Sequence, residues 1–367
     1  MLSLKIGRIC YEKEVKMRKN LSVISLFLAL IIIASAWPQS AAAAPAKAPE
    51  KTAAVGKTIQ WKAASGWPPG VFTRRMHDRF IAHVDKQSGG QLKISIVGPE
   101  AWPSAEQAAA LAKGAFDIVF TTPGYYEPIL PGGGFSNFAW GTMKEKRAAG
   151  VVALADRLHR EKLNAKYLFE FSLGPYQMYL TKPVKKIEDF RGMRIRTVPS
   201  FHPMVGALGA TPSWMPDAEA IDALRLGVID GAQTAASQVT MLGYHEVTKY
   251  AVAPHPAFAC SNAIVNLDSY NKLPDNLKKL LEKLALEFET EAEKLLKEEL
   301  DTEYAKWKKA GLQIIVLPEE DGKKLTSTAK EVYLEKMVKP RAPNLVPEIR
   351  AVLDKLPFNP AKHLATK

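Results

Sequence analysis

Two arginines, Arg194 and Arg196, stand two residues apart in the stretch FRGMRIRTVP at residues 190–199. In a β-strand this spacing places both side chains on one face of the sheet. An arginine near the carboxyl end of a strand can hold a carboxylate through two parallel hydrogen bonds. The stretch therefore indicates either a site for an anion or an exposed, charged edge strand, and the residues alone leave both interpretations open.

Aromatic residues stand where strand-like segments give way to helix-like ones. Trp67 follows the first strand-like segment, Tyr125 follows the strand-like residues 116–122, and Trp214 precedes a helix-like segment. Rings at such turns can stack on a ligand in a cleft, although each can equally pack in a core. These residues weakly favour a ligand with an apolar part.

The sequence contains no signature of a catalytic site. The H-E-x-x-H spacing, the G-x-S-x-G elbow and the G-x-x-x-x-G-K-[ST] loop are all missing. The seven histidines are scattered, as surface or packed histidines are, so they indicate no metal site, and no cofactor is expected. The absence of these signatures weakens the interpretation as an enzyme without excluding it. An exported hydrolase or isomerase on an α/β scaffold stays an alternative.

Composition sets the class of the protein. The chain has 367 residues, 47% of them hydrophobic and 24% charged, which excludes a disordered chain and suits two domains. Its two cysteines cannot form a disulfide scaffold. The net charge is +12, but the basic residues are dispersed, so no nucleic-acid partner is expected.

The N-terminal residues resemble an export signal. A charge-free apolar run at residues 21–37 follows two basic residues and leads into four alanines. This order predicts a cleaved signal peptide over residues 1–44, with Met17 as a candidate start, although a membrane anchor is the alternative. Residues 45–56 predict a flexible leader. Cys260 would then be the only cysteine of the exported chain, and we expect it to be buried.

Strand-like and helix-like segments alternate after the leader, which predicts an α/β fold. The predicted strands are 58–63, 92–97 and 312–317, and the predicted helices are 71–87, 276–309 and one near 348–355. Asp275 is expected to cap the long helix. The charged residues of that helix predict a solvated face stabilised by i,i+4 ion pairs.

An internal repeat is the strongest pattern in the chain. Residues 103–117 and 216–230 are identical at seven of fifteen aligned positions. Ser104 and Asp217 are expected to cap a helix, and Gly114 and Gly227 to end it in a left-handed turn. A chance likeness between α/β units is the alternative. The preferred interpretation is a pair of similar lobes with a ligand cleft between them.

The chain resembles the solute-binding proteins of tripartite ATP-independent periplasmic (TRAP) transporters, DctP type. The resemblance covers roughly residues 59–317 and rests on four segments, FTRRMHDRFIAHVDKQSGGQLKISIVGPEAW, GAFDIVF, FRGMRIRTVPS and LGATPSWMPDAEAIDALRLGVIDGAQT. It implies a two-lobed periplasmic-binding-protein-like fold with a cleft between the lobes and a long helix that spans both. On this basis we expect lobe I to comprise 57–173 plus 260–299, and lobe II 174–259 plus 300–367.

The resemblance also implies the function. Arg196 matches the family arginine that pairs with the substrate carboxylate. Tyr176, Thr234 and Thr122 fall at positions where some members carry an arginine, an asparagine and a glutamate for sialic acid. These departures favour a small organic acid, such as an aromatic or 2-oxo acid, over a polyhydroxylated sugar acid. We expect a periplasmic monomer that delivers its ligand to TRAP permease subunits, with a sensor module as an alternative.

Overall fold

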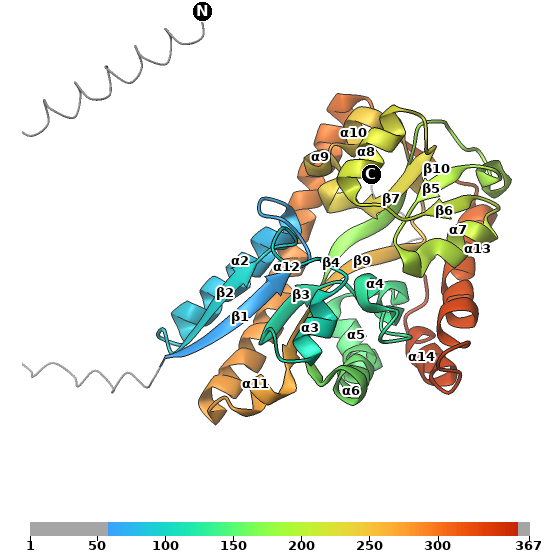
Figure 1. Ribbon diagram of the computed structural model, residues 1–367. Helices are drawn as coiled ribbons and strands as arrows, with labels where there is room; N and C mark the ends of the chain where they lie inside the picture. The colour runs from blue at the N-terminus through green and yellow to red at the C-terminus, as the bar shows by residue number, and fades with distance from the viewer. Residues whose placement is uncertain (1–57, 359–367) are drawn as a thin grey trace, which may run out of the picture. The chain divides into compact units, whose positions relative to one another are not determined.

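One curved, mixed sheet runs through residues 58–358, the part of the chain that the computed structural model describes (Figure 1). Its order is β2-β1-β3-β9-β4-β7-β5-β6, and β8 and β10 join beside β4. The strands are β1 (Ile59–Ser65), β2 (Leu92–Val97), β3 (Ile118–Thr121), β4 (Ala165–Leu180), β5 (Arg194–Arg196), β6 (Thr211–Ser213), β7 (Gly231–Ala235), β8 (Tyr250–Ala253), β9 (Ala257–Asn266) and β10 (Gln313–Val316). The predicted signal peptide and leader lie outside the described residues.

Helices cover both faces of this sheet. The α-helices are α2 (Phe72–Gln87), α3 (Gln107–Ala112), α4 (Pro123–Tyr126), α5 (Met143–Ala149), α6 (Val151–Leu163), α7 (His202–Ala207), α8 (Asp217–Arg225), α9 (Val239–Leu242), α10 (Tyr244–Val247), α11 (Leu267–Asn271), α12 (Asp275–Ala310), α13 (Glu319–Val332) and α14 (Leu345–Leu353). The shorter turns are η1 (Phe135–Phe138), η2 (Ile187–Phe190), η3 (Pro199–Phe201), η4 (Ala236–Gln238) and the π-helical η5 (Tyr333–Val338). All six elements predicted from periodicity are therefore confirmed, with small shifts at their ends.

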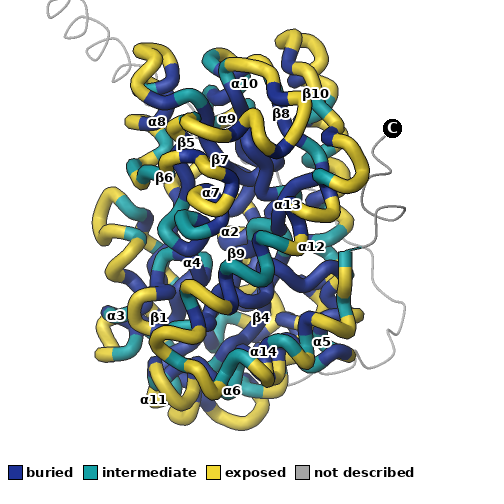
Figure 2. Tube along the Cα trace, turned by 90° about the vertical axis from the view of Figure 1, so that its right-hand side faces the viewer, coloured by how far each residue is buried: buried dark blue, intermediate teal, exposed yellow. Residues whose placement is uncertain are grey.

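The long strands β4 and β9 form the centre of the molecule, where Figure 2 shows an almost continuously buried trace. Aromatic rings from α2, β4 and α12 meet on one side of β4. The ring of Phe80 lies 4.6 Å from that of Phe169 and 5.3 Å from that of Phe288. All three rings are shielded from water, so this contact ties α12 to the strand that both ends of the sheet share.

Helix α12 is 36 residues long and contacts α2 near one end of the sheet and α9 and α10 near the other. It therefore spans both ends, as expected (Figure 1). The prediction that its charged face is simply solvated is wrong, because Glu289 and Glu303 are buried. Glu289 accepts two hydrogen bonds of 2.6 Å from Arg147 of α5. Part of the charged face thus binds neighbouring elements.

The internal repeat forms the same substructure twice. Asp117 and Lys62 exchange backbone and side-chain hydrogen bonds, in which Lys62 N–H donates to Asp117 Oδ2 over 2.7 Å. Asp230 and Arg194 make the same contacts, with a donor–acceptor distance of 2.9 Å. The parallel pairing of β1 with β3 is also repeated in register by β5 with β7. The repeat is therefore structural, and it places Arg196 at the position of Ala64.

The expected helix caps are wrong. Helix α3 begins three residues after Ser104, whose hydroxyl donates instead to the carbonyl of Gly66 over 2.9 Å. Asp217 and Asp275 each occupy the first turn of a helix but make no capping hydrogen bond. The physical reason is that Pro216 and Pro274 precede them in extended conformation and take the capping position. Their carboxylates can still favour the positive helix end.

Gly227, one of the two repeated glycines, tests whether the left-handed turn at the end of the helix requires a glycine. Gly227 has φ = +67°, and a Cβ added there would meet no atom within 4 Å, so only backbone strain opposes a side chain. We expect Gly227→Ala to destabilise the protein by about 1–2 kcal/mol, because alanine is strained in the left-handed region. The midpoint of urea unfolding measures this effect.

Gly206 of α7 provides the matched control, since a Cβ there also meets nothing and its φ is not in the left-handed region. Gly206→Ala is expected to leave the midpoint unchanged or to raise it, because alanine favours a helix. Equal midpoints for the two variants would contradict the argument.

Candidate ligand-binding site

A cavity with about 520 Å³ of empty space, part of it open to solvent, lies between the β1–β3 unit and the β5–β7 unit. Six of the seven residues predicted for the site line this cavity, namely Trp67, Thr122, Tyr125, Tyr176, Arg196 and Thr234. They come from both units, and β4 supplies Tyr176 from the centre of the sheet. The sequence therefore located the side chains of one common cavity.

Arg196 is the most buried charged group of this cavity, with 2% of the residue exposed. Strand β5 ends at this residue, so its side chain emerges at the carboxyl end of a parallel strand. Its Nε donates to the carbonyl of Met215 over 2.9 Å, and Nη1 donates to the carbonyl of Gln233 over 3.2 Å. Two neighbouring backbone segments thus fix the plane of the guanidinium.

An ion pair compensates the charge of Arg196. Its Nη1 lies 2.9 Å from Oδ1 of Asp217, which also accepts a 2.7 Å hydrogen bond from the hydroxyl of Tyr244. Burial alone would lower the pKa of Arg196, but Asp217 and nearby tyrosines raise it overall, so the guanidinium stays charged. Within residues 58–358, Nη2 makes no hydrogen bond. This nitrogen remains available to a ligand.

Aromatic rings form one wall of the cavity. The ring of Tyr125 lies 5.9 Å from that of Trp67 and 6.4 Å from that of Trp214. The backbone at Trp67 is held by Ser65, whose hydroxyl contacts Nδ1 of buried His77 at 3.1 Å. Burial lowers the pKa of His77 well below its ordinary value, so the His77 ring that contacts Ser65 is uncharged.

Trp214 and Arg194 take different places from those expected. Trp214 does not line the cavity within the described part of the chain; it is 43% exposed and covers the guanidinium of Arg196, with 4.8 Å between charge and ring centre. The expected pair of arginines does not form either. Arg194 turns to Asp230, whose carboxylate it meets at 2.9 Å, and its side chain is about half exposed. The repeated aspartate therefore holds Arg194 away from the cavity.

Sequence reasoning missed several residues of the cavity. Asp217, predicted as a helix cap, stands three residues after Trp214 and lines the cavity. Asn137 lines the cavity with a buried side-chain oxygen that has no hydrogen-bond partner within residues 58–358. Gln238 also lines it and donates to Thr73 of α2 over 2.8 Å, which joins the two units. No local motif marks Asn137 or Gln238.

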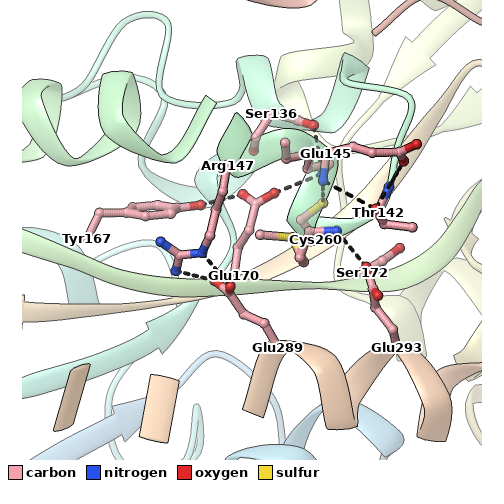
Figure 3. Close-up of polar contacts among 12 residues, drawn as sticks. Ser136, Thr142, Glu145, Arg147, Tyr167, Glu170, Ser172, Cys260, Glu289 and Glu293 are labelled. Atoms are coloured by element: carbon pink, nitrogen blue, oxygen red, sulfur yellow. Dashed lines mark hydrogen bonds and ion pairs between the residues drawn. The ribbon is translucent and has the colours of Figure 1, made fainter. Parts of the chain in front are cut away.

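Behind one wall of the cavity lies a buried ionic network (Figure 3). Cys260 lines the cavity and is buried, as expected, and burial raises the pKa of its thiol to about 12. Lys146 approaches the sulfur at 3.7 Å and donates to Glu170 over 2.8 Å. Tyr167 donates to the other carboxylate oxygen of Glu170. The Cys260 thiol therefore stays protonated and unreactive in the cavity lining. The charge of Lys146 is compensated by Glu170 inside the protein.

The described residues provide neither a metal cluster nor a membrane span. No group of three histidine, cysteine or acidic side chains within residues 58–358 has the geometry to hold a metal ion. In the same residues, no helix is both long enough and apolar enough to cross a bilayer.

Comparison with known proteins settles the family. Residues 65–339 match the model of the bacterial extracellular solute-binding proteins, family 7 (DctP). The chain belongs to this family. It is also 31% identical over 136 residues to the C4-dicarboxylate-binding periplasmic protein DctP of Rhodobacter capsulatus, which is 36% of this chain and 41% of that protein. Members of the DctP family are solute-binding proteins rather than enzymes.

Solved structures confirm the two-lobed fold. A TRAP periplasmic solute-binding protein from Roseobacter denitrificans with bound β-D-glucuronate has a TM-score of 0.70 at 19% identity, over 80% of this chain and 99% of that chain. A marine metagenome TRAP protein specific for pyroglutamate has a TM-score of 0.71 at 18% identity, over 82% and 99%. The exact lobe boundaries stay a prediction, and α14, expected in lobe II, contacts α6 and η1 of lobe I.

The ionic network behind the cavity predicts a large stability effect. Lys146→Met would leave Glu170 buried without its cation, so we expect a loss of about 3–5 kcal/mol at pH 7. Burial alone would raise the Glu170 pKa, but Lys146 and its hydrogen bonds lower it overall. Without Lys146 the folded-state pKa rises, so the carboxyl takes up a proton on acidification. The deficit should therefore be smaller at pH 5 than at pH 7.

Lys297→Met is the control, because its ion pair with Asp301 is largely exposed and contributes little. Thermal or urea midpoints at both pH values measure the difference. If Lys146→Met and Lys297→Met shift the midpoint equally, the buried pair does not have the role assigned to it.

Proposed function

We propose that this protein is a periplasmic receptor that binds a small organic acid between its lobes and delivers it to a TRAP-type membrane permease. The observation that carries the proposal is the buried guanidinium of Arg196, which lines the cavity, is fixed by two carbonyls and keeps Nη2 without a hydrogen bond within residues 58–358. An arginine held in this way recognises a carboxylate with directional, charge-assisted hydrogen bonds. The predicted signal peptide would direct export to the periplasm and would be cleaved from the exported chain.

The remaining cavity residues fit this role. Tyr176, Thr234 and Thr122 offer hydroxyl groups, and Trp67 and Tyr125 provide apolar surface. The family relatives named above support a carboxylate ligand, since glucuronate and pyroglutamate both carry one. Closure of the lobes around the acid would remove its ion pair with Arg196 from water, which strengthens the attraction. Within the proposal, Trp214 acts on Arg196 by covering it rather than by touching the ligand.

The decisive variant is Arg196→Ala. A thermal-shift screen of aliphatic, 2-oxo and aromatic acids would first identify a ligand, because a ligand that binds only the folded state raises the melting temperature. Titration calorimetry should then show a loss of affinity of about 100-fold in Arg196→Ala, since the lost bonds are charge-assisted. Folding of the variant is checked by circular dichroism.

Arg194→Ala is the matched control, because Arg194 lies on the same strand but is paired with Asp230 away from the cavity. Its affinity should equal that of the unmodified protein. Undiminished binding by Arg196→Ala would refute the assignment. Conversion of the bound acid into a product during long incubation would point to an enzyme instead.

A further inference from the structure

Asp217 brings a negative charge into the cavity beside Arg196. It lines the cavity from the first turn of α8, and about a third of its side chain is exposed. Its Oδ1 contacts Arg196 and accepts from Tyr244, whereas Oδ2 makes no hydrogen bond within residues 58–358. The two side chains, in contact at 2.9 Å, thus line the cavity together, and each carries one polar atom, the donor Nη2 and the acceptor Oδ2, that makes no hydrogen bond within residues 58–358.

The two groups cancel each other's charge. Among the described residues that line the cavity, Arg196 and Asp217 are the only ones with a formal charge, because the Cys260 thiol stays protonated. The lining is therefore neutral as a whole. The cations Lys146 and Arg194 do not add to it, since Glu170 and Asp230 compensate them outside the cavity.

A simple monocarboxylate fits this charge balance poorly. Its carboxylate would share one guanidinium with the carboxylate of Asp217, and the closed site would carry a net negative charge. Two like charges a few ångströms apart repel each other strongly where water is excluded. A ligand with a positive group next to its carboxylate avoids this cost, because the positive group can lie against Asp217.

We propose that the ligand is a zwitterionic α-amino acid, with its carboxylate at Nη2 of Arg196 and its ammonium group at Oδ2 of Asp217. This proposal rests on the proposed function and assigns to Asp217 a direct role in selecting the ligand. An α-amino acid carries both groups on one carbon, which matches adjacent donor and acceptor groups of the protein. The complex of protein and ligand then holds two cations and two anions in alternation.

The rest of the cavity selects an uncharged side chain. Beyond the ion pair its surface includes the rings of Tyr176, Phe201 and Phe258, and the first two lie 5.0 Å apart. No further charged side chain of the described residues is present to receive a second carboxylate or a distal ammonium group. The ligand side chain is therefore uncharged, with an aliphatic or aromatic part that meets these rings.

Two series of ligands that differ only at the α-carbon test this proposal. The first is L-phenylalanine, 3-phenyllactate, phenylpyruvate and 3-phenylpropanoate. The second is L-leucine, 2-hydroxy-4-methylpentanoate, 4-methyl-2-oxopentanoate and 4-methylpentanoate. Titration calorimetry on purified protein, freed of co-purified ligand, gives each affinity. In at least one series the amino acid should bind at least tenfold more tightly than every other member.

The variant Asp217→Asn removes the charge but keeps an oxygen that can accept from Tyr244. It should weaken amino-acid binding at least tenfold and leave binding of the unsubstituted acid unchanged or stronger. Asp222→Asn is the matched control, because Asp222 lies on the same helix, is 71% exposed at its side chain and pairs with Arg225 outside the cavity lining. It should change neither affinity.

The remaining outcomes separate this proposal from the receptor function. If an oxo, hydroxy or unsubstituted acid binds as tightly as the amino acid, or if Asp217→Asn keeps amino-acid affinity, the zwitterion proposal is wrong. The receptor function then still stands, provided that Arg196→Ala abolishes binding of the acid. If no member of either series binds, the amino-acid class is overturned. If acids bind without Arg196, both proposals fail.

Discussion

The site depends on the burial of one guanidinium in a protein interior that cannot hydrate it. Arg196 is charged, 2% exposed and placed at the end of a strand, so its charge must be balanced by groups within contact distance. The carbonyls of Met215 and Gln233 and the carboxylate of Asp217 provide this balance in the structure. A ligand must therefore join an existing ion pair rather than neutralise a bare cation.

The internal repeat shows that different residues build the scaffold and the binding site. Both copies use a helix, a left-handed glycine and an aspartate that binds the preceding parallel strand, with the same register. Only the second copy carries an arginine at the strand end, where the first has Ala64. The repeated residues thus build two similar walls, and the non-repeated residues give the cavity its chemistry. Binding groups can change in such a fold without loss of the walls.

Periodicity and turn residues were sufficient to predict six of the elements and two of the rings that line the cavity, and the family resemblance added Arg196, Tyr176, Thr234 and Thr122. Helix α2 and strand β2 follow directly from the spacing of their apolar residues, and Trp67 and Tyr125 from their places after strands. The family resemblance supplied the role of Arg196. What escaped were contacts between residues distant in sequence, such as Asp217 with Tyr244 or Gln238 with Thr73. A carboxylate in a first helical turn is favourable for local reasons, so its sequence position does not reveal its tertiary partner.

The proposed function requires that Arg196 receives the carboxylate of the ligand. A crystal structure of the protein with its tightest-binding acid would show this contact. We expect a carboxylate oxygen about 2.7–2.9 Å from Nη2 of Arg196, inside the cavity between the lobes. A carboxylate that is bound elsewhere, with the guanidinium contacting protein atoms alone, would contradict it.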